Sequence, residues 1–479
     1  MSGNTIGLRS ERGPVLLAVM LSTGLVAIDS TIIATAVPSI VRDIGGFAEF
    51  PWLFSIYLLA QAVSVPIYGK LSDLFGRKPV ILWGIGLFLL GSVMCGVAWN
   101  VWVLIAFRVV QGLGAGAIMP TTITIVGDLY SVPERAKVQG YIASVWGISS
   151  VVGPTLGGVF SEYVSWRWIF FVNVPLCLFA AAMIARRFQE KVPRGRPAID
   201  YPGAALLTCG LTLVILGVLE GGQAWAWDSP VSVAILAVGA AALVAFAIVE
   251  RTATDPVLPL WVFRRRLLIT SGATSAGVGA ILLGLTSYIP TYVQDVLGTG
   301  PLVAGFALAA LLIGWPIAGS QAGRVYLRIG FRGCALIGST VVFAGTGLML
   351  LLGRHSSVSA VAACCLIIGL GMGLTAAPTL IAAQSSVGWG DRGVVTANNL
   401  FLRSLGSSLG VAVFGAIANA TIRAEQADAA RLSAAVHHII IGLVIIAAAM
   451  IISVALMARG DRPDIEAAPD TPVPAENPA

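Results

Sequence analysis

Fourteen long apolar runs, separated by short segments that hold most of the charges, dominate this sequence. A run of roughly 20 apolar residues is what an α-helix needs to cross a bilayer. Only 11% of the 479 residues are charged, less than half of what a soluble domain carries, so lipid has to cover the surface. We therefore expect an all-α membrane protein with fourteen transmembrane helices. The runs cover residues 14–38, 50–69, 79–98, 101–127, 137–161, 166–186, 202–220, 230–249, 267–294, 302–323, 333–353, 357–386, 394–420 and 437–458.

The lysine and arginine residues orient these helices. If the chain starts in the cytoplasm, 22 of the 29 basic residues fall on the cytoplasmic side and five on the outer side. Cytoplasmic segments carry such an excess, and a miscounted helix would mix the two sets. The sequence thus predicts a multi-pass protein of the cytoplasmic (inner) membrane with both termini in the cytoplasm. Residues 1–13 would precede the first helix, and residues 459–479, rich in Pro, Ala and acids, would form a disordered tail.

Two stretches of the chain recur 254 to 257 residues later. The segment Gly69–Lys78 returns as Gly323–Arg332, and Gly112-Leu-Gly114-Ala-Gly116 returns as Gly369-Leu-Gly371-Met-Gly373. Parallel repeats are a transporter architecture, with the binding site between the halves near the membrane midplane. We predict six-helix bundles over residues 14–186 and 267–458, joined by a linker over residues 187–266 that contains two extra transmembrane helices.

Asp29 and Arg108 are charged residues inside predicted spans, where a charge costs about 2.5–3.5 kcal/mol on insertion scales. At 1.5 Å per residue, both lie about 10–14 Å from the outer surface and could pair. Burial favours the protonated carboxyl, so Asp29 is a candidate for proton coupling and for releasing Arg108 when it is protonated. Two structural alternatives remain. Asp29 could be hydrogen-bonded to neighbouring Ser and Thr hydroxyls, and Arg108 could be a permanent strut on backbone carbonyls.

Arg403 lies in the middle of the run 394–420, with no acid at its depth in that half. It could attract an anionic substrate or neutralise Asp29 across the interface. Equally, Asn398, Asn399 and backbone carbonyls could satisfy it. The remaining candidates for the substrate cavity are Tyr57, Gln61, Gln111, Trp146, Tyr288 and Trp315.

The connection that follows Gly69 holds Asp73, Gly76 and Arg77 on a short turn. A carboxylate there could cap the positive end of a neighbouring helix and latch the outward-facing state. A solvated turn that carries topology charges is the alternative, but it does not explain the spacing. The second copy has Leu327 in place of Asp73, so it lacks this acid.

These strings resemble the signatures of the Major Facilitator Superfamily over nearly the whole chain. Gly69–Lys78 resembles its loop signature, Arg108–Gly112 its fourth-helix signature, and Gly147–Gly158 its fifth-helix antiporter signature, through Gly153, Pro154, Gly157 and Gly158. Leu25–Pro38 and Trp166–Pro175 resemble the fourteen-helix drug:proton antiporter branch. The resemblance implies a proton-coupled exporter of amphipathic drugs and antibiotics, powered by the proton gradient without a cofactor. The expected partners are a small-molecule substrate, protons and lipid. Nucleic acid is not expected, and we expect a monomer.

Other functions were weighed against the same sequence. Export of an endogenous metabolite or lipid, or uptake, remains open, because the cavity residues come from many helices. A sensor without transport would need a sizeable soluble domain, and no loop is long enough. For an enzyme, Gly406-Ser-Ser408-Leu-Gly410 fits a nucleophile elbow, but it lies inside a predicted span with no preceding strand. No metal-ligand spacing is present among the six cysteines and three histidines.

Overall fold

The computed structural model describes residues 7–45, 51–190, 200–221, 225–253, 256–421 and 429–458, and these residues form an all-α fold. Its only β feature within these ranges is an isolated bridge between Gly221 and Trp225. The predicted disordered tail lies outside the described residues. The elements are α1 (Gly13–Ile44), α2 (Pro51–Phe75), α3 (Arg77–Gly96), α4 (Val101–Leu129), α5 (Val132–Tyr163), α6 (Trp168–Phe171), α7 (Asn173–Arg187), α8 (Tyr201–Glu220), α9 (Pro230–Glu250), η1 (Leu260–Phe263), α10 (Arg266–Thr291), η2 (Tyr292–Val296), α11 (Pro301–Met349), α12 (Val358–Ser385), η3 (Trp389–Asp391), α13 (Arg392–Thr421) and α14 (Ala429–Ala455).

The helices follow the predicted runs with two differences. The run predicted over 166–186 is divided into α6 and α7, and the runs 302–323 and 333–353 lie in the single 49-residue α11. Gly330 breaks α11 with a φ of 82°, and Gly76 separates α2 from α3 with a φ of 94°. A side chain at either position would be strained, so glycine is required at both turns of the repeat. Eleven helices in the described ranges are long and apolar enough to span a membrane, while the fourteen crossings and the sides of the termini remain predictions.

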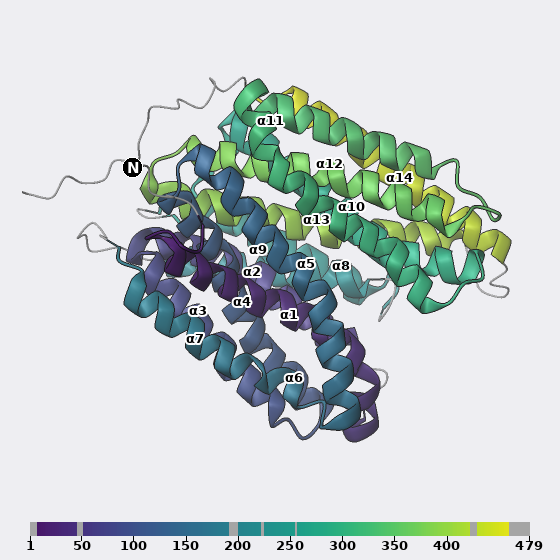
Figure 1. Ribbon diagram of the computed structural model, residues 1–479, viewed down its shortest axis with the longest axis horizontal. Helices are drawn as coiled ribbons and strands as arrows, with labels where there is room; N and C mark the ends of the chain where they lie inside the picture. The colour runs from purple at the N-terminus through teal and green to yellow at the C-terminus, as the bar shows by residue number, and fades with distance from the viewer. Residues whose placement is uncertain are drawn as a thin grey trace, which may run out of the picture.

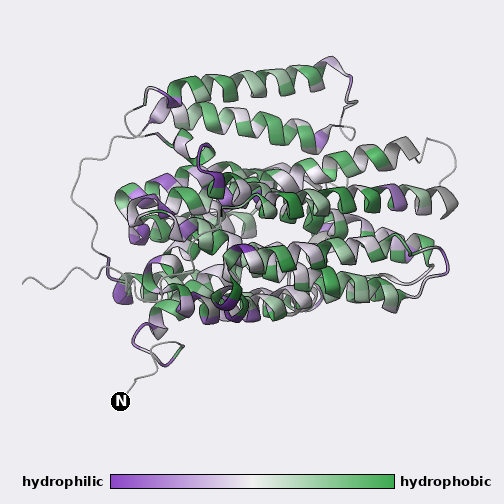
Figure 2. Ribbon diagram, turned by 90° about the horizontal axis from the view of Figure 1, so that it is seen from above, coloured by the Kyte–Doolittle hydropathy of each residue, from purple (hydrophilic) through white to green (hydrophobic). Residues whose placement is uncertain are grey.

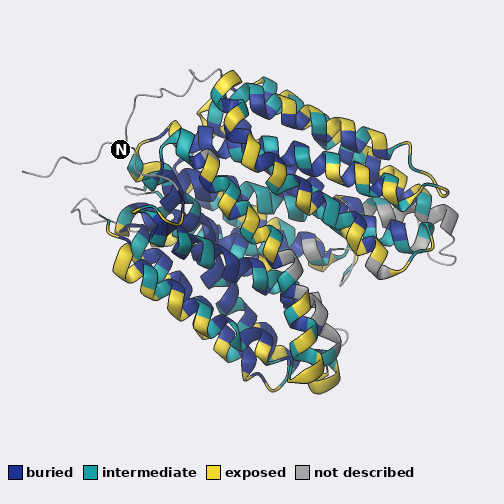
Figure 3. Ribbon diagram, viewed as in Figure 1, coloured by how far each residue is buried: buried dark blue, intermediate teal, exposed yellow. Residues whose placement is uncertain are grey.

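The helices gather into two bundles (Figure 1). The first comprises α1–α7 and the second α10–α14, while α8 and α9 pair with each other and α8 packs against α2 and α13. Figure 1 shows the bundles close together near the N-terminus of α1 and diverging toward the other end. Hydrophobic residues run along the helices (Figure 2), and exposed residues follow the outer faces while buried ones lie inside (Figure 3). Apolar side chains thus cover the surface that lipid would contact.

The glycine repeat packs identically in both bundles. A methyl group added to Gly112 would lie 2.6 Å from the backbone oxygen of Tyr57, and one added to Gly369 would overlap that of Leu311. Leu311 stands 254 residues after Tyr57, which is the offset of the loop repeat. Gly114 and Gly371 likewise approach the backbones of α3 and α11 at positions separated by the same offset. The two bundles therefore repeat their close helix contacts, and small residues allow the backbones to meet.

Candidate functional site

The first group of functional candidates lies inside the bundle α1–α7, where Asp29 and Arg108 form an ion pair. Arg108 Nη1 donates to Asp29 Oδ2 at 2.7 Å, between α1 and α4. Each residue is only 1% exposed. A buried charge is tolerated when it is paired and hydrogen-bonded, so each residue lowers the cost of burying the other. The depths calculated from the sequence place the two groups at the same level, and in the structure they are in contact.

Neutral polar side chains complete a network around Asp29. Gln111 Nε2 donates to Asp29 Oδ1 at 2.8 Å, while its Oε1 accepts from Arg108 at 2.8 Å. Asn173 Nδ2, at the start of α7, lies 3.4 Å from Asp29 Oδ1, and both amide groups donate to Ser92 Oγ on α3. Four helices therefore contribute side chains to one buried polar group. We call Asp29, Ser92, Arg108, Gln111 and Asn173 the carboxylate network.

The aromatic ring of Tyr57 packs on the guanidinium of Arg108, with the Arg108 Cζ atom 4.1 Å from the ring centroid. Such stacking stabilises a desolvated cation. Arg108 Nε also donates to the backbone oxygen of Leu53 at 3.1 Å, so the predicted ion pair and the predicted carbonyl contact coexist. Tyr57 and Gln111 are both buried in this packing. In this conformation both side chains fill the bundle interior, and their role in lining a substrate cavity stays a prediction.

The structural alternative for Asp29 involved neighbouring hydroxyl groups. Ser30 and Thr31 instead hydrogen-bond to carbonyls of their own helix, and Thr31 also donates to the backbone oxygen of Ser149 on α5. Asp29 is bonded by nitrogen donors from α4 and α7. Protonating its carboxyl group would remove the ion pair and leave Arg108 as the charged member of the network.

The second group of functional candidates lies at the end of the molecule where α1, α3 and α13 begin. We call this end the basic end. Asp73, in the last turn of α2, accepts from the backbone nitrogens of Gly393 at 2.9 Å and Val394 at 2.8 Å. These are unsatisfied donors of the first turn of α13, and a carboxylate there is favoured by the helix dipole. A methyl group on Gly69 would overlap Ala397. Glycine thus lets α2 approach α13 closely enough for the cap.

Arg77 stabilises this helix cap, and the side chain of Arg77 is fully buried. Its guanidinium pairs with Asp73 at 2.9 Å and with Asp128 of α4 at 2.9 Å. It also donates to the backbone oxygen of Trp389 at 2.6 Å and stacks on that ring, 3.8 Å from the centroid. The solvated turn considered from the sequence is therefore not what forms. Arg77 joins two helices of one bundle to the segment that precedes α13 of the other.

Further contacts connect the bundles at the basic end, and their residues were not among the predicted site residues. Arg392 pairs with Asp128 at 3.0 Å, and Tyr326 Oη donates to the backbone oxygen of Val132 at 2.9 Å. Arg135 donates to the backbone oxygens of Gly127 and Tyr130. Burial, and then the neighbouring Arg392, lower the pKa of Arg135 to about 10. The Glu134-Arg135 and Asp391-Arg392 repeat was the available signal for these contacts.

The glycines of the fifth-helix signature behave differently from one another. A methyl group on Gly153 would overlap Thr31 Oγ1, so this glycine allows α5 to pack closely on α1. Gly157 is buried, and the side chain of Pro154 lies outside the described residues. A methyl group on Gly158 would meet nothing within 4 Å, so the structure shows no close helix packing at this glycine.

Arg403 has no hydrogen bond or ion pair within the described part of the chain, and it is partly exposed. The amide of Asn399 bonds to Ser271 and Ser275 on α10, so it is not the predicted partner. The Oδ1 atom of Asn398 is buried and has no hydrogen-bond partner in the described part of the chain. The carbonyl of Arg403 approaches Gly279 closely, which places the residue on the side of α13 that faces α10.

The other cavity candidates are dispersed. Tyr288 packs edge-on against Phe414, and Trp315 packs against the core of the second bundle. Trp146 is 40% exposed on α5, and Gln61 is half-buried on α2. The structure does not bring these four together with the carboxylate network.

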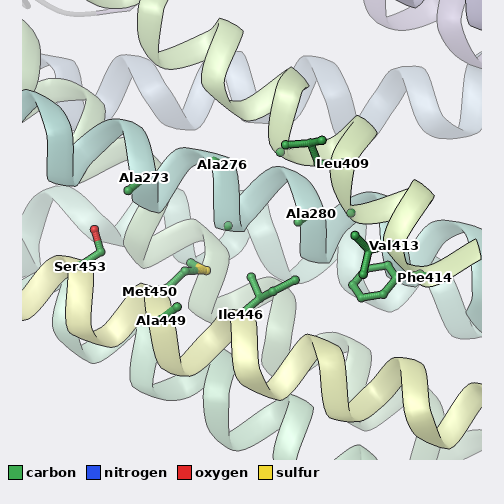
Figure 4. A pocket seen from close by; sticks show the side chains of 13 residues that line it. Ala273, Ala276, Ala280, Leu409, Val413, Phe414, Ile446, Ala449, Met450 and Ser453 are labelled. Carbon is green, nitrogen blue, oxygen red and sulfur yellow. The ribbon is translucent and has the colours of Figure 1, made fainter. Parts of the chain in front are cut away.

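An apolar groove of about 420 Å³ lies between α10, α13 and α14 (Figure 4). Small residues open it, including Ala276 and Gly277 on α10 and Gly406 and Gly410 on α13. Leu409, Phe414 and Met450 supply much of its apolar wall. None of the predicted cavity residues lines this groove. The described residues contain no group of three or more potential metal-ligating side chains.

Comparison with known proteins places these features in context. The pattern of the Major Facilitator Superfamily matches residues 19–411. The chain is 36% identical to Multidrug resistance protein 3 of Bacillus subtilis (strain 168) over 84% of its length and 79% of that protein. It is 33% identical to Multidrug transporter protein MdtP of the same organism, over 86% of this chain and 76% of the relative. The solved structure of the human organic anion transporter MFSD10 (TETRAN) has the same fold, with a TM-score of 0.65, 17% identity, and coverage of 93% of this chain and 99% of that one.

Proposed function

Because the chain belongs to the Major Facilitator Superfamily and is thus a membrane transporter rather than an enzyme, we propose that it is a proton-coupled antiporter. It exports amphipathic small molecules across the cytoplasmic membrane by alternating access. The buried pair of Asp29 and Arg108 is the observation that carries this proposal. The names of the two Bacillus relatives support a multidrug substrate range. An endogenous metabolite or lipid as the exported molecule is the alternative.

Proton coupling follows from the composition of the carboxylate network. Arg108 keeps its charge at any physiological pH, whereas Asp29 can lose its charge by binding a proton. Removing one partner of a buried ion pair costs about 3–5 kcal/mol, because the other charge stays buried without compensation. Protonation of Asp29 therefore strains the packing of α1 against α4. Movement of these helices, which lets Arg108 find water or substrate, relieves the strain.

The contacts at the basic end define a second element of the transport cycle, a conformation in which that end is closed. If that end is cytoplasmic, as the charge distribution predicts, Asp73, Arg77 and Arg392 close the cytoplasmic side. The bundles diverge toward the opposite end (Figure 1), which fits an outward-facing conformation. In this proposal a proton from outside reaches Asp29 in this state. The cytoplasmic contacts then open, and the proton leaves as substrate binds.

Arg403 bears on the charge of the substrate. It has no partner within the described residues, while the charges of Asp29 and Arg108 balance each other. Arg403 therefore adds one positive charge that no described residue balances, which favours substrates with an anionic or electron-rich group over dications. An inside-negative membrane potential also favours anion export, by about 2.3 kcal/mol per charge at 100 mV. We accordingly propose neutral and anionic amphiphiles as the preferred cargo.

Purified protein in liposomes with an imposed pH gradient tests the coupling. An internal pH dye reports proton movement when cationic, neutral and anionic amphiphiles are added in turn. We expect substrate-dependent proton movement in the wild type and none in Asp29→Asn, which keeps the size of the side chain but cannot bind and release a proton. Asp228→Asn, at an exposed acid between α8 and α9, is the control. Equal proton movement in Asp29→Asn and the control would refute the role of Asp29.

A further inference from the structure

Two carboxyl groups meet at the base of the α8–α9 hairpin, away from the carboxylate network. Glu250, the last residue of α9, is 4% exposed, and its Oε1 accepts from the backbone nitrogen of Leu258 at 2.5 Å. Asp200 precedes α8, and its Oδ1 caps that helix by accepting from the backbone nitrogen of Gly203 at 2.8 Å. One oxygen of each carboxyl group therefore has a clear structural role.

The second oxygen of each group is buried and has no hydrogen-bond partner among the residues that the structure describes. These atoms are Asp200 Oδ2 and Glu250 Oε2. A methyl group on Gly203 would overlap Asp200 Oδ2 and would lie 3.0 Å from Glu250 Oε2, so both oxygens converge on this glycine. Asp200 also acts electrostatically on Glu250. Both oxygens thus lie beside Gly203, and neither has a donor within the described ranges.

Two ionised carboxylates cannot hydrogen-bond to each other, because both are only acceptors. Like charges in contact at a buried site cannot both persist, and one proton shared by the pair removes the conflict. We propose that Asp200 and Glu250 share one proton and form a second proton-binding site, on the inserted hairpin. This site does not depend on Asp29 and would exist whether or not transport is coupled to protons.

Among the described residues, Lys70 of α2 is a cation that acts on Glu250, and it also interacts with other groups. One positive charge balances one negative charge of the pair, so the pair with one proton and Lys70 together are neutral. The shared proton also ties the start of α8 to the loop that leaves α9. Because α8 contacts both α2 and α13, this junction borders both bundles.

A carbodiimide that dissolves in the membrane tests the proposal, since it modifies protonated carboxyl groups in apolar surroundings. The full-length protein in liposomes is treated with dicyclohexylcarbodiimide between pH 6 and 9, and modified residues are found by mass spectrometry. We expect Glu250 to be modified at least tenfold faster than the exposed Glu162 at pH 7, with the rate falling as pH rises. Asp200→Asn should reduce modification of Glu250 at least fivefold, because an amide donor stabilises the ionised form.

Thermal unfolding distinguishes a shared proton from a merely accessible side chain. Glu250→Gln keeps a donor facing Asp200 at every pH. The wild type should therefore lose thermal stability between pH 5 and 8 relative to Glu250→Gln, because the folded protein releases its shared proton as pH rises through this range. Equal modification of Glu250 and Glu162, unchanged modification in Asp200→Asn, or parallel pH profiles of the two proteins would each overturn the proposal. All three readouts are independent of transport, so they cannot be confused with failure of the antiport mechanism.

Discussion

Replacing Asp73 with asparagine should open the basic end of the molecule. The carboxylate accepts from two backbone nitrogens at the start of α13, at 2.9 and 2.8 Å. An asparagine keeps one acceptor oxygen and turns an NH₂ group toward the other N–H, so at least one charge-assisted bond is lost. Such a bond contributes about 1.5–3 kcal/mol. We expect a shift of about 2 kcal/mol toward the state in which the basic end is open, or about 30-fold in the ratio of the two states.

Spin labels on Lys137 of α5 and Ser386 after α12 can measure this ratio. Both positions are exposed and belong to different bundles. Of the six free cysteines, Cys209 is exposed and would be replaced by serine, while the others are buried. Asp391→Asn is the matched control, because Asp391 is an exposed acid beside the same helix and its side chain has no hydrogen bond within the described residues. Distance distributions that coincide for Asp73→Asn and this control would refute the latch.

Three further outcomes follow from the same geometry. Arg108→Gln should lower the thermal midpoint in detergent, because Asp29 then stays buried without its counter-charge, and adding Asp29→Asn should recover stability. A double variant as unstable as Arg108→Gln alone would contradict the ion-pair argument. Gly69→Ala should separate the labelled positions, since its methyl group would overlap α13, whereas Gly158→Ala has open space and should change nothing. Arg403→Gln should slow liposome transport of carboxylate amphiphiles at least tenfold more than that of neutral analogues of the same size, and equal slowing would exclude a charge-selecting role.

The contact between Asp29 and Arg108 could be anticipated because helix rise fixes depth. Counting residues from the ends of two membrane spans places their side chains at one level. The repeat was informative for a similar reason: Gly76 and Gly330 share an offset, and both adopt a positive φ. The spacing of residues in the sequence thus predicts how deep a side chain lies along a helix and where a helix ends in a turn, including the break in α11.

Lateral packing could not be predicted in this way. Ser92 and Asn173 join the carboxylate network from α3 and α7, and nothing in one sequence says which faces of those helices meet. Asp128 looks like an ordinary charge at the end of a span, yet it binds both Arg77 and Arg392. Gln111 was predicted as a candidate for lining the substrate cavity, and in the structure its amide group binds Asp29 and Arg108.

The two bundles repeat their glycine contacts but differ in what they enclose. The repeat offset places Cys365 at the position of Arg108 and Ile368 at that of Gln111. Both residues belong to the buried apolar core of the second bundle. The packing of the duplicated halves has therefore stayed alike while their interiors diverged, and a titratable network is present in the first.

The order in which the ion pair is synthesised has a consequence for membrane insertion. Asp29 and Arg108 are 79 residues apart. At about 5–20 residues per second, α1 leaves the ribosome roughly 4–16 s before its counter-ion arrives. An aspartate can enter lipid as the neutral acid during that interval, whereas an arginine cannot shed its charge. Because the acid lies in the first helix and the base in the fourth, α1 can stay uncharged in the membrane until α4 arrives. The pair then ionises only when both helices are in the bilayer.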